Sequence, residues 1–507
     1  MVRDTTNDDV NWSRRRFVST AGAIGLGASV GTGTVNARSD KANGRGKGRG
    51  HGRGGGNGKG RGGPVAGPMR GLVRQSYRYF EEFTNEDTGL APDRVDLDGG
   101  TATLARRTSP ANIGMQLLST VSANELGFLD DEKSKNRLST VLDTLERVKK
   151  WNGHYFRWYK TEDATIDVDF GGEFISTVDN GWLTAGLVVV GQAFESLNDR
   201  TSALVEAMDY SKLYDAESPT NPFNFDDPVG QMYGGYDYAA GEYTDFNFGL
   251  FNTEPRVAGY LAIGKGDVPK EHWWGMFRTF PPTIELDDGS FKYGDYSWTT
   301  QQPEGEFKTY DGVEVWEGHY DLYGTKYVPS YGGSMFESLM PSLVMKEKEL
   351  GTEALGPNNH RQAQLQIEYA RKQGYPAWGF SPCATPDGYV TTGVSELGVS
   401  GYDERKRYQG LVTPHATFLA AEYAPTAAVR ENIKTFRQFD VTGPYGFYDS
   451  VDVQSGTVTK AYLALDQGMS IGSITNYLTD GALRDHLHAD PIGSKPEDLL
   501  AAEEFTI

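Results

Sequence analysis

The sequence contains a single cysteine, Cys383, among its 507 residues. One cysteine excludes both an intramolecular disulfide and a cysteine-based zinc site, so packing must stabilise the fold. The chain also lacks any stretch that approaches the roughly 20 unbroken apolar residues of a membrane-spanning helix. We therefore expect no membrane span. The hydrophobic share of 38%, with 12% aromatic residues, is sufficient for a large buried core.

Positive charge is scarce outside the N-terminal region. Residues 1–70 hold 13 of the 49 Lys and Arg residues but only 4 of the 69 Asp and Glu residues, which leaves the rest of the chain with a formal charge of −29. Such a surface repels nucleic acid and anionic membranes and disfavours an acidic polymer substrate, so a neutral glycan is the better fit. Surfaces this acidic keep proteins soluble in molar salt, and we expect a halophilic protein.

The N-terminus has the order of a twin-arginine export signal. Residues 13–18 read Ser-Arg-Arg-Arg-Phe-Val, a weakly apolar run follows at 21–28, and small residues surround Ala37. This pattern predicts a signal peptide over residues 1–37, recognised by the Tat translocon, and a secreted or cell-surface protein. Cleavage after Ala37 is the main expectation, and an uncleaved anchor is the alternative. Folding before export is consistent with the lack of disulfides.

A glycine-rich basic segment follows the signal. Residues 38–63 consist almost wholly of Gly, Arg, Lys, Asn and His, a composition that cannot offset the entropy cost of a packed fold. We predict a disordered linker over residues 38–70. On an exported protein, a spacer or a contact with acidic cell-surface polymer is favoured over RNA binding.

Helical periodicity dominates the chain from residue 71 onward. Ser109 and Pro110 have the types favoured at an N-cap and a first helical position, and Ile113, Leu117 and Val121 recur at four-residue spacing. Further helical runs are predicted around residues 181–197, 200–210, 249–263, 334–347, 358–373, 413–422, 425–438 and 466–478. Strand-like alternation is concentrated at 281–331. These patterns predict an all-α toroid over residues 71–490, with a small β insertion and long aromatic loops, followed by an acidic C-terminal tail over 491–507.

The predicted loops are rich in aromatic residues that could stack on sugar rings. Core packing explains about half of them equally well. The aromatic candidates include Trp158, Trp182, Trp273, Trp274, Tyr293, Trp298, Trp316 and Trp378.

Cleavage of a glycosidic bond needs two carboxyl groups, one acting as a protonated acid and the other as a base or nucleophile. Asp179 begins an apolar helix, where a helix cap is an equally good interpretation. Glu254 precedes another helix, and a capping carboxylate paired with Arg256 is its structural alternative. Glu337 lies between apolar residues, and burial there would raise its pKa. Asp449 and Asp466 are similar loop or cap residues.

Seven segments, taken together and in this order, resemble the glucoamylase-like domain of cyclic β-1,2-glucan synthases and, more distantly, bacterial endo-β-1,2-glucanases. The resemblance covers nearly all of residues 70–490. The segments lie at 90–94, 108–114, 153–159, 176–179, 253–256 with 264–269, 335–341, and 445–449.

The resemblance implies an (α/α)6 barrel, glycosidic chemistry on a β-glucan, and no cofactor. It places Glu254 at the acid catalyst, Asp179 on another acidic motif of the cleft, and Glu337 at a further cleft glutamate. The synthase-type domain has a nucleophilic glutamate after Gly-Ile-Ser, but this chain has Pro382 there. Because proline cannot act as a nucleophile, we expect inverting hydrolysis rather than transglycosylation.

The expected mechanism has Glu254 donating a proton to the leaving oxygen while Asp179, or else Asp449, activates water. The alternatives are a non-catalytic glycan-binding protein on the same fold, a transglycosylase, and a polysaccharide lyase, which the acidic chain disfavours. No metal site is predicted. The expected substrate contacts are Arg256, Trp158, Trp182, Trp378, Tyr408, His415 and Asp449.

Overall fold

The structure is a computed structural model that describes residues 66–98, 101–218, 229–280, 284–285, 291–292, 299–400 and 408–507. The predicted export signal and most of the predicted linker lie outside these residues, as do Tyr293 and Trp298. Within the described part of the chain, no helix combines the length and the apolar character that crossing a bilayer requires.

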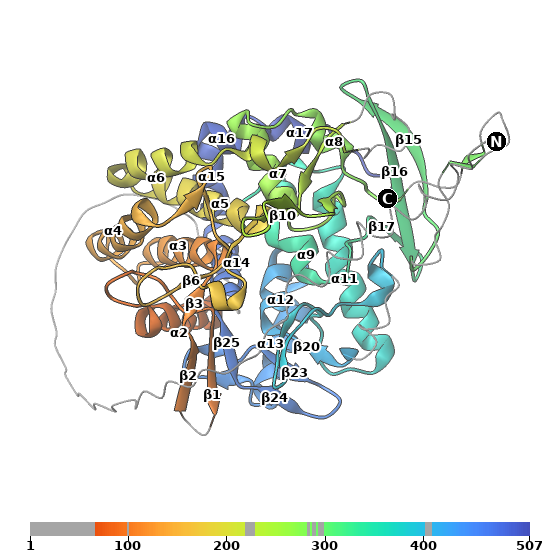
Figure 1. The fold of residues 1–507 in the computed structure, drawn as a ribbon. Helices are drawn as coiled ribbons and strands as arrows, with labels where there is room; N and C mark the ends of the chain where they lie inside the picture. Colours follow the sequence, from red (N-terminus) through yellow and green to blue (C-terminus); the bar gives the residue numbers. More distant parts are fainter. Residues whose placement is uncertain are drawn as a thin grey trace.

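Helices form most of the regular structure (Figure 1). The longer ones are α2 (Ala66–Phe83), α3 (Pro110–Glu125), α4 (Asp131–Arg147), α5 (Thr177–Ala193), α6 (Glu195–Ala207), α7 (Arg256–Lys265), α11 (Leu355–Gln373), α13 (Thr426–Gln438), α14 (Ala464–Thr479) and α15 (Ala482–Ala489). The shorter ones are α8 (Glu271–Gly275), α9 (Met335–Leu339), α10 (Glu347–Leu350), α12 (Pro414–Leu419), α16 (Pro491–Ser494) and α17 (Glu497–Ala502).

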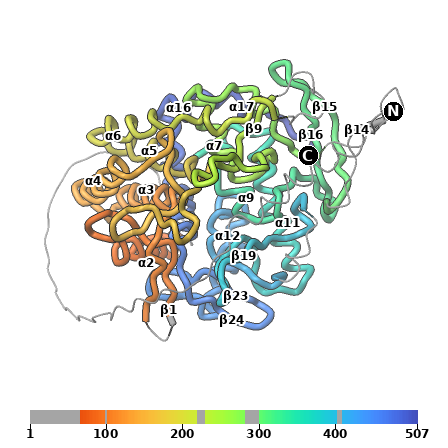
Figure 2. The backbone as a smooth tube through the Cα atoms, in the orientation of Figure 1, coloured from red at the N-terminus to blue at the C-terminus, as the bar shows by residue number. Residues whose placement is uncertain are grey.

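The core is built around α3, α5 and α14, whose residues are almost all buried. Helix α14, labelled in Figure 1, comes from the C-terminal part of the chain, yet it lies beside α2 and α3. Figure 2 shows the same blue C-terminal segment behind the orange N-terminal helices. Glycines allow the close approach. A Cβ on Gly114 of α3 would lie 2.4 Å from the Trp182 carbonyl oxygen, and one on Gly468 of α14 would lie 2.4 Å from the Cβ of Met115.

A glycine also allows α5 to pack closely against α7. A Cβ at Gly181 would lie 2.7 Å from the Cβ of Ala258, so only glycine permits this spacing. Gly181 follows Asp179 by two residues and Ala258 follows Glu254 by four. The close packing of α5 and α7 therefore brings their N-terminal ends together, and with them the carboxylates of Asp179 and Glu254.

The predicted helix at Ser109 and Pro110 is confirmed, because the Ser109 hydroxyl accepts a hydrogen bond from the Asn112 N–H at 3.1 Å. Other boundaries differ. Helix α5 begins four residues before the predicted start because Ser176 caps it. The segment predicted as one helix over 334–347 is instead divided into α9, a 3-10 turn containing Pro341, and α10.

Many short antiparallel strands connect the helices, so the all-α prediction was wrong in excluding strands beyond one insertion. That insertion is present as a β15–β16 hairpin, in which Asp311 and Gly312 both have positive φ, as a tight turn requires. The sheets that concern the site or the core have the following order: β2 (Thr101–Ala105), β1 (Arg94–Asp98) and β25 (Ala461–Leu463); β11 (Glu242–Tyr243), β10 (Gly235–Asp237) and β7 (Phe174–Ser176); β15 (Glu304–Tyr310), β16 (Val313–Leu322) and β17 (Thr325–Tyr327); β18 (Cys383–Thr385) and β19 (Gly388–Val390); β20 (Leu411–Val412), β23 (Ser450–Asp452) and β24 (Thr457–Thr459).

The remaining strands form small pairs or short sheets at the ends of the helices. They are β3 (Arg107–Thr108) with β6 (Tyr159–Lys160), β4 (Lys150–Trp151) with β5 (His154–Tyr155), β21 (Thr442–Gly443) with β22 (Gly446–Phe447), β13 (Ile284–Glu285) with β14 (Phe291–Lys292), and β12 (Asn247–Phe248), β9 (Gln231–Tyr233) and β8 (Tyr214–Asp215).

Residues 491–507, predicted as an acidic tail, are packed against the rest of the fold. Glu503 is fully buried and accepts a hydrogen bond from Arg278 Nε at 2.6 Å, while only 6% of Phe505 is exposed. The Thr506 hydroxyl donates to the Glu317 carbonyl oxygen on β16 at 2.6 Å. The C-terminal segment is therefore an integral part of the core.

Candidate active site

Three of the predicted acidic residues converge at the N-terminal ends of α5, α7 and α9. Only 8% of Glu254 is exposed, and its pKa is raised well above the usual value, first by burial and then by the charges of Asp179 and Glu337. The Trp182 indole lies close enough to favour the ionised form, although its N–H makes no hydrogen bond of ordinary geometry. A carboxyl in this setting keeps its proton to a higher pH than a free glutamate does, which suits a general acid.

Asp179 is partly exposed, unlike Glu254, and lies in the first turn of α5. Its backbone N–H donates to the Ser176 hydroxyl at 3.3 Å, so the cap is Ser176 rather than Asp179. Burial raises the pKa of the Asp179 carboxyl, while the positive charge of Arg157 opposes this effect. The Asp179 side chain is therefore available for chemistry next to Glu254.

Glu337 is committed to the backbone around α9. Its carboxylate accepts hydrogen bonds from the Gly332 N–H at 2.8 Å and from the hydroxyls of Ser330 and Ser334, both at 3.0 Å. The reciprocal bond from the Glu337 N–H to the Ser334 hydroxyl completes a capping box. The structure thus gives Glu337 a capping role and places its carboxylate near Glu254, and its predicted catalytic role stays a prediction.

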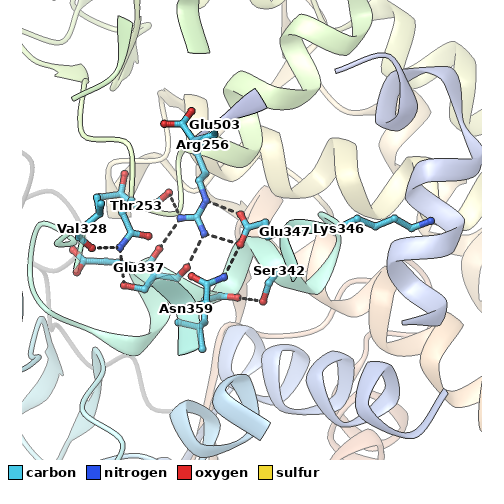
Figure 3. Close-up of polar contacts among 12 residues, drawn as sticks. Thr253, Arg256, Val328, Glu337, Ser342, Lys346, Glu347, Asn359 and Glu503 are labelled. Atoms are coloured by element: carbon cyan, nitrogen blue, oxygen red, sulfur yellow. Dashed lines mark hydrogen bonds and ion pairs between the residues drawn. The ribbon is translucent and has the colours of Figure 1, made fainter. Parts of the chain in front are cut away.

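Arg256 was expected to contact substrate, but its side chain is fully buried (Figure 3). Its guanidinium forms a two-pronged ion pair with Glu347, at 2.7 Å from Nε and 3.0 Å from Nη2. The other three N–H groups donate to backbone carbonyl oxygens of Thr253, Glu337 and Ser338. With all five donors engaged, Arg256 instead ties the segment before α7 to α9.

The predicted stacking residues occupy different environments. Trp182 and Trp378 are core residues, with 1% and 6% exposed, so neither offers an open ring face. Trp158 is partly exposed, and the Arg107 guanidinium lies 5.6 Å from the centre of its ring. Tyr408 is partly exposed and directly follows residues 401–407, which are not among those described. Trp158 and Tyr408 therefore remain the aromatic candidates for substrate contact.

A second acidic cluster contains Asp449, Asp466 and His415, each with 3% or less of its surface exposed. Burial lowers the pKa of His415 to about 3, so the ring is neutral. Burial raises the pKa of Asp449, and burial together with the charge of Asp449 raises that of Asp466 well above its usual value. The three side chains line one small cavity together with residues of α2, α12 and α14.

Tyr389 on β19 is influenced by the charges of both clusters. Its pKa is raised well above the usual value by burial and then by the charges of Asp466, Cys383, Asp449 and Glu254. The side chain is partly exposed, in contrast to Asp449 and Asp466. Tyr389 is therefore within electrostatic range of both the buried pair and the Glu254 carboxyl.

Sequence reasoning did not select Asp93 and Tyr389 as site residues and did not retain Asp466. Asp93 accepts a hydrogen bond from Asn112 at 2.9 Å, and its charge raises the pKa of Asp179. Asp93 lies within one of the segments that carry the family resemblance, and Asp466 is a lone carboxylate in an otherwise apolar helix start, which are signals that could have identified them. Tyr389 carries no comparable signal in the sequence.

Comparisons with known proteins confirm the resemblance inferred from the motifs. Residues 302–491 match a family described as "Putative glucoamylase", and residues 72–224 match one described as a protein of unknown function. The cyclic β-(1,2)-glucan synthase NdvB of Rhizobium meliloti is 24% identical, over 85% of this chain and 18% of the synthase. The chain thus spans about a fifth of that relative's length.

Solved structures share the fold. The endo-β-1,2-glucanase of Chitinophaga pinensis, solved with sophorotriose and glucose, has a TM-score of 0.65 and 16% identity over 86% of this chain and 98% of that one. A protein of Bacteroides caccae described as a "putative glucoamylase" has a TM-score of 0.64 and 18% identity over 86% of this chain and 98% of that one. The endo-β-1,2-glucanase of Talaromyces funiculosus has a TM-score of 0.62 and 10% identity over 87% and 89%. At these identities the likeness concerns the fold.

Proposed function

Because the chain has a glucoamylase-like fold, we propose that it is a glycoside hydrolase that cleaves a β-glucan, with β-1,2-glucan as the favoured substrate. The observation that carries the proposal is the buried Glu254 carboxyl beside Asp179 and the capping carboxylate of Glu337. Burial and like charges keep the proton on Glu254 at a pH where a free glutamate would have lost it. The proton can then be given to a leaving oxygen.

The proposed reaction is a single displacement. Glu254 transfers its proton to the glycosidic oxygen as the bond from that oxygen to the anomeric carbon breaks. A water molecule attacks the anomeric carbon from the opposite face, and its proton passes to Asp179. We favour Asp179 over Asp449 as the base because Asp179 is partly exposed, whereas only 3% of Asp449 is exposed.

The environment of residue 382 favours inversion. Pro382 has no nucleophilic group, and the adjacent Ser381 hydroxyl accepts a hydrogen bond from the Phe336 N–H at 3.2 Å. A retaining mechanism requires a carboxylate that forms a covalent intermediate, and proline cannot supply one. Inverted anomeric configuration of the first-formed product is therefore expected.

The choice of β-1,2-glucan is supported by the structural neighbours from Chitinophaga pinensis and Talaromyces funiculosus, which are endo-β-1,2-glucanases. The synthase relative in Rhizobium meliloti also concerns a β-1,2-glucan. We further propose that the packed helices complete the (α/α)6 toroid, and that the arginine pair near the N-terminus directs export through the Tat route.

The test is a reducing-end assay with the purified chain, at high and low salt, against a panel of β-glucans that includes linear β-1,2-glucan. Glu254→Gln should lower turnover at least about 100-fold, as loss of a general acid does, while the fold is retained. Glu271→Gln, on the partly exposed start of α8, is the matched control and should retain activity.

Full turnover in the Glu254→Gln variant would overturn the proposed mechanism. Binding of a glucan without new reducing ends in the unmodified protein would favour the non-catalytic alternative. New linkages without net release of reducing ends would indicate transglycosylation, and a product absorbing in the ultraviolet would indicate a lyase.

A further inference from the structure

The buried cluster of His415, Asp449 and Asp466 joins three segments that are distant in the sequence. His415 lies on α12, Asp449 follows β22, and Asp466 lies in the first turn of α14. One ligand atom from each residue lies within 4.8 Å of the other two. The proposed reaction assigns chemistry to Glu254 and Asp179 and to none of these three residues.

Several atoms of the cluster have no hydrogen-bond partner although they are buried. His415, Asp449 and Asp466 are 2%, 3% and 3% exposed. The atoms without a hydrogen-bond partner are His415 Nδ1, Asp449 Oδ1 and both carboxylate oxygens of Asp466. Buried polar atoms are normally satisfied, so a group of four in one place needs a physical cause.

The orientation of the His415 ring helps to explain why these buried atoms have no hydrogen-bond partner. Nε2 lies 3.3 Å from the Thr413 hydroxyl, and Nδ1 on the other side of the ring faces Asp466 Oδ2 at 3.4 Å. If Nε2 carries the ring proton, Nδ1 presents a lone pair toward a carboxylate oxygen. In a metal-binding histidine, the ring nitrogen that does not bind the metal usually makes a hydrogen bond of this kind, which fixes the orientation of the ring.

Asp449 is held on its other side. Its Oδ2 accepts a hydrogen bond from the Ala384 N–H at 2.5 Å, which leaves Oδ1 as the unpartnered oxygen. The backbone of β18 therefore orients this carboxylate in the same manner as Thr413 orients the imidazole. His415 and Asp449 are thus each held in place by a hydrogen-bonding group that lies outside the cluster.

We propose that His415, Asp449 and Asp466 bind one divalent transition-metal ion, with Zn²⁺ as the ion best suited to this nitrogen and oxygen donor set. Two carboxylates and a neutral imidazole balance the charge of a divalent cation and satisfy the unpartnered atoms. Ligand atoms of a tetrahedral zinc ion lie roughly 3.4 Å apart. The three ligand atoms lie within 4.8 Å of one another, so they move closer together when the ion binds.

The site is structural in this proposal, because its ligands are buried and join three segments of the core. It departs from the expectation of no metal drawn from the sequence. It goes beyond the proposed function, since none of its ligands touches the substrate there. Cys383, the sole thiol of the chain, is buried beside the two aspartates and is a further potential ligand.

The competing account is a proton shared between Asp449 and Asp466, with no metal. A shared proton lowers the like-charge repulsion of two buried carboxylates. In that account His415 carries its ring proton on Nδ1, which faces Asp466 Oδ2 at 3.4 Å, and Nε2 faces the Thr413 hydroxyl. Metal content distinguishes the two accounts without reference to enzyme activity.

The experiment is elemental analysis of the full chain after equilibration with Zn²⁺ and removal of the excess. We expect about one zinc per chain, and removal by a chelator should lower Tm by at least about 2 °C, because an ion that binds only the native state stabilises it. Replacement by Co²⁺ should give visible ligand-field absorption, with an added charge-transfer band if the Cys383 thiolate coordinates.

The site is localised with His415→Ala and Asp466→Asn. Both should lose the bound zinc and the chelator effect, whereas His486→Ala, which removes a histidine paired with Glu125 at the surface, should retain both. Glu254→Gln should also retain zinc, which separates this proposal from the proposed reaction. The proposal is overturned if the unmodified protein neither retains Zn²⁺ nor shows a Co²⁺ spectrum, or if both variants bind zinc normally.

Discussion

Glu254 and Arg256 are two residues apart, yet their side chains lie in opposite electrostatic environments. Arg256 is fully buried and paired with Glu347, so its charge is neutralised inside the core. Glu254 is surrounded by other carboxylates and has no described cationic partner that offsets their effect on its pKa. The comparison shows that a buried charge with a well-placed partner can be kept ionised, whereas a buried carboxyl among like charges has a raised pKa and holds its proton more tightly.

The largest effect should come from breaking the buried ion pair between Arg256 and Glu347. Glu347→Ala leaves the Arg256 guanidinium buried without its partner, and the expected cost is about 3–5 kcal/mol of unfolding free energy. Chemical denaturation measures this. Arg256→Met combined with Glu347→Ala should recover part of the loss, because no unpaired charge remains. A single-variant cost below about 1 kcal/mol would contradict the structural role.

Separating the helices that carry Asp179 and Glu254 should have the next largest effect. Gly181→Val places side-chain atoms where even a Cβ would lie 2.7 Å from the Cβ of Ala258, and overpacking of this kind costs about 1–3 kcal/mol. Activity should fall as well, because the two carboxylates move apart. Gly71→Ala on α2, where a Cβ meets nothing within 4 Å, is the control and should be neutral or stabilising.

The raised pKa of Glu254 predicts that the stability of the protein depends on pH. Because the pKa of Glu254 is higher in the folded protein than the usual 4.5, the folded state binds more protons. Its contribution to stability therefore falls as pH rises from about 4.5 through the raised pKa. Glu254→Gln should remove that part of the decline, and be the more stable protein at alkaline pH. Parallel pH curves for the two proteins would refute the assignment.

The smallest effect should come from Trp182→Phe. The indole lowers the pKa of Glu254, so its replacement by a smaller ring without an N–H should raise that pKa further. The alkaline limb of the activity profile should move to higher pH, with less than about a tenfold change in kcat/KM at the optimum. A shift of that limb to lower pH would show that Trp182 acts in another way.

Local features of the chain predicted local structure well. Ser109 and Pro110 begin a helix because a capping hydroxyl and a proline at the first position act within one turn. The predicted helix over 334–347 failed at Pro341, where a proline interrupts the backbone hydrogen bonds. The short strands were missed because two or three residues are too few for an alternating pattern.

The acidic residues around Glu254 were identifiable from sequence because each lies near a helix start within a recognisable segment. Their roles were harder to predict. Glu337 caps α9 through contacts within seven residues, which a capping-box pattern at Ser334 would have indicated. Arg256 could not be assigned in this way, because its partner Glu347 is 91 residues away.

Composition and local pattern are enough to indicate a helix-rich domain and to single out the carboxylates of the proposed site, because charge, capping and periodicity act over short distances. Which carboxylate keeps its proton, which arginine is neutralised, and which aspartates meet a histidine were decided only when α5, α7, α12 and α14 packed together. Desolvation and charge pairing depend on distances in space, and those distances arise between residues far apart in the chain.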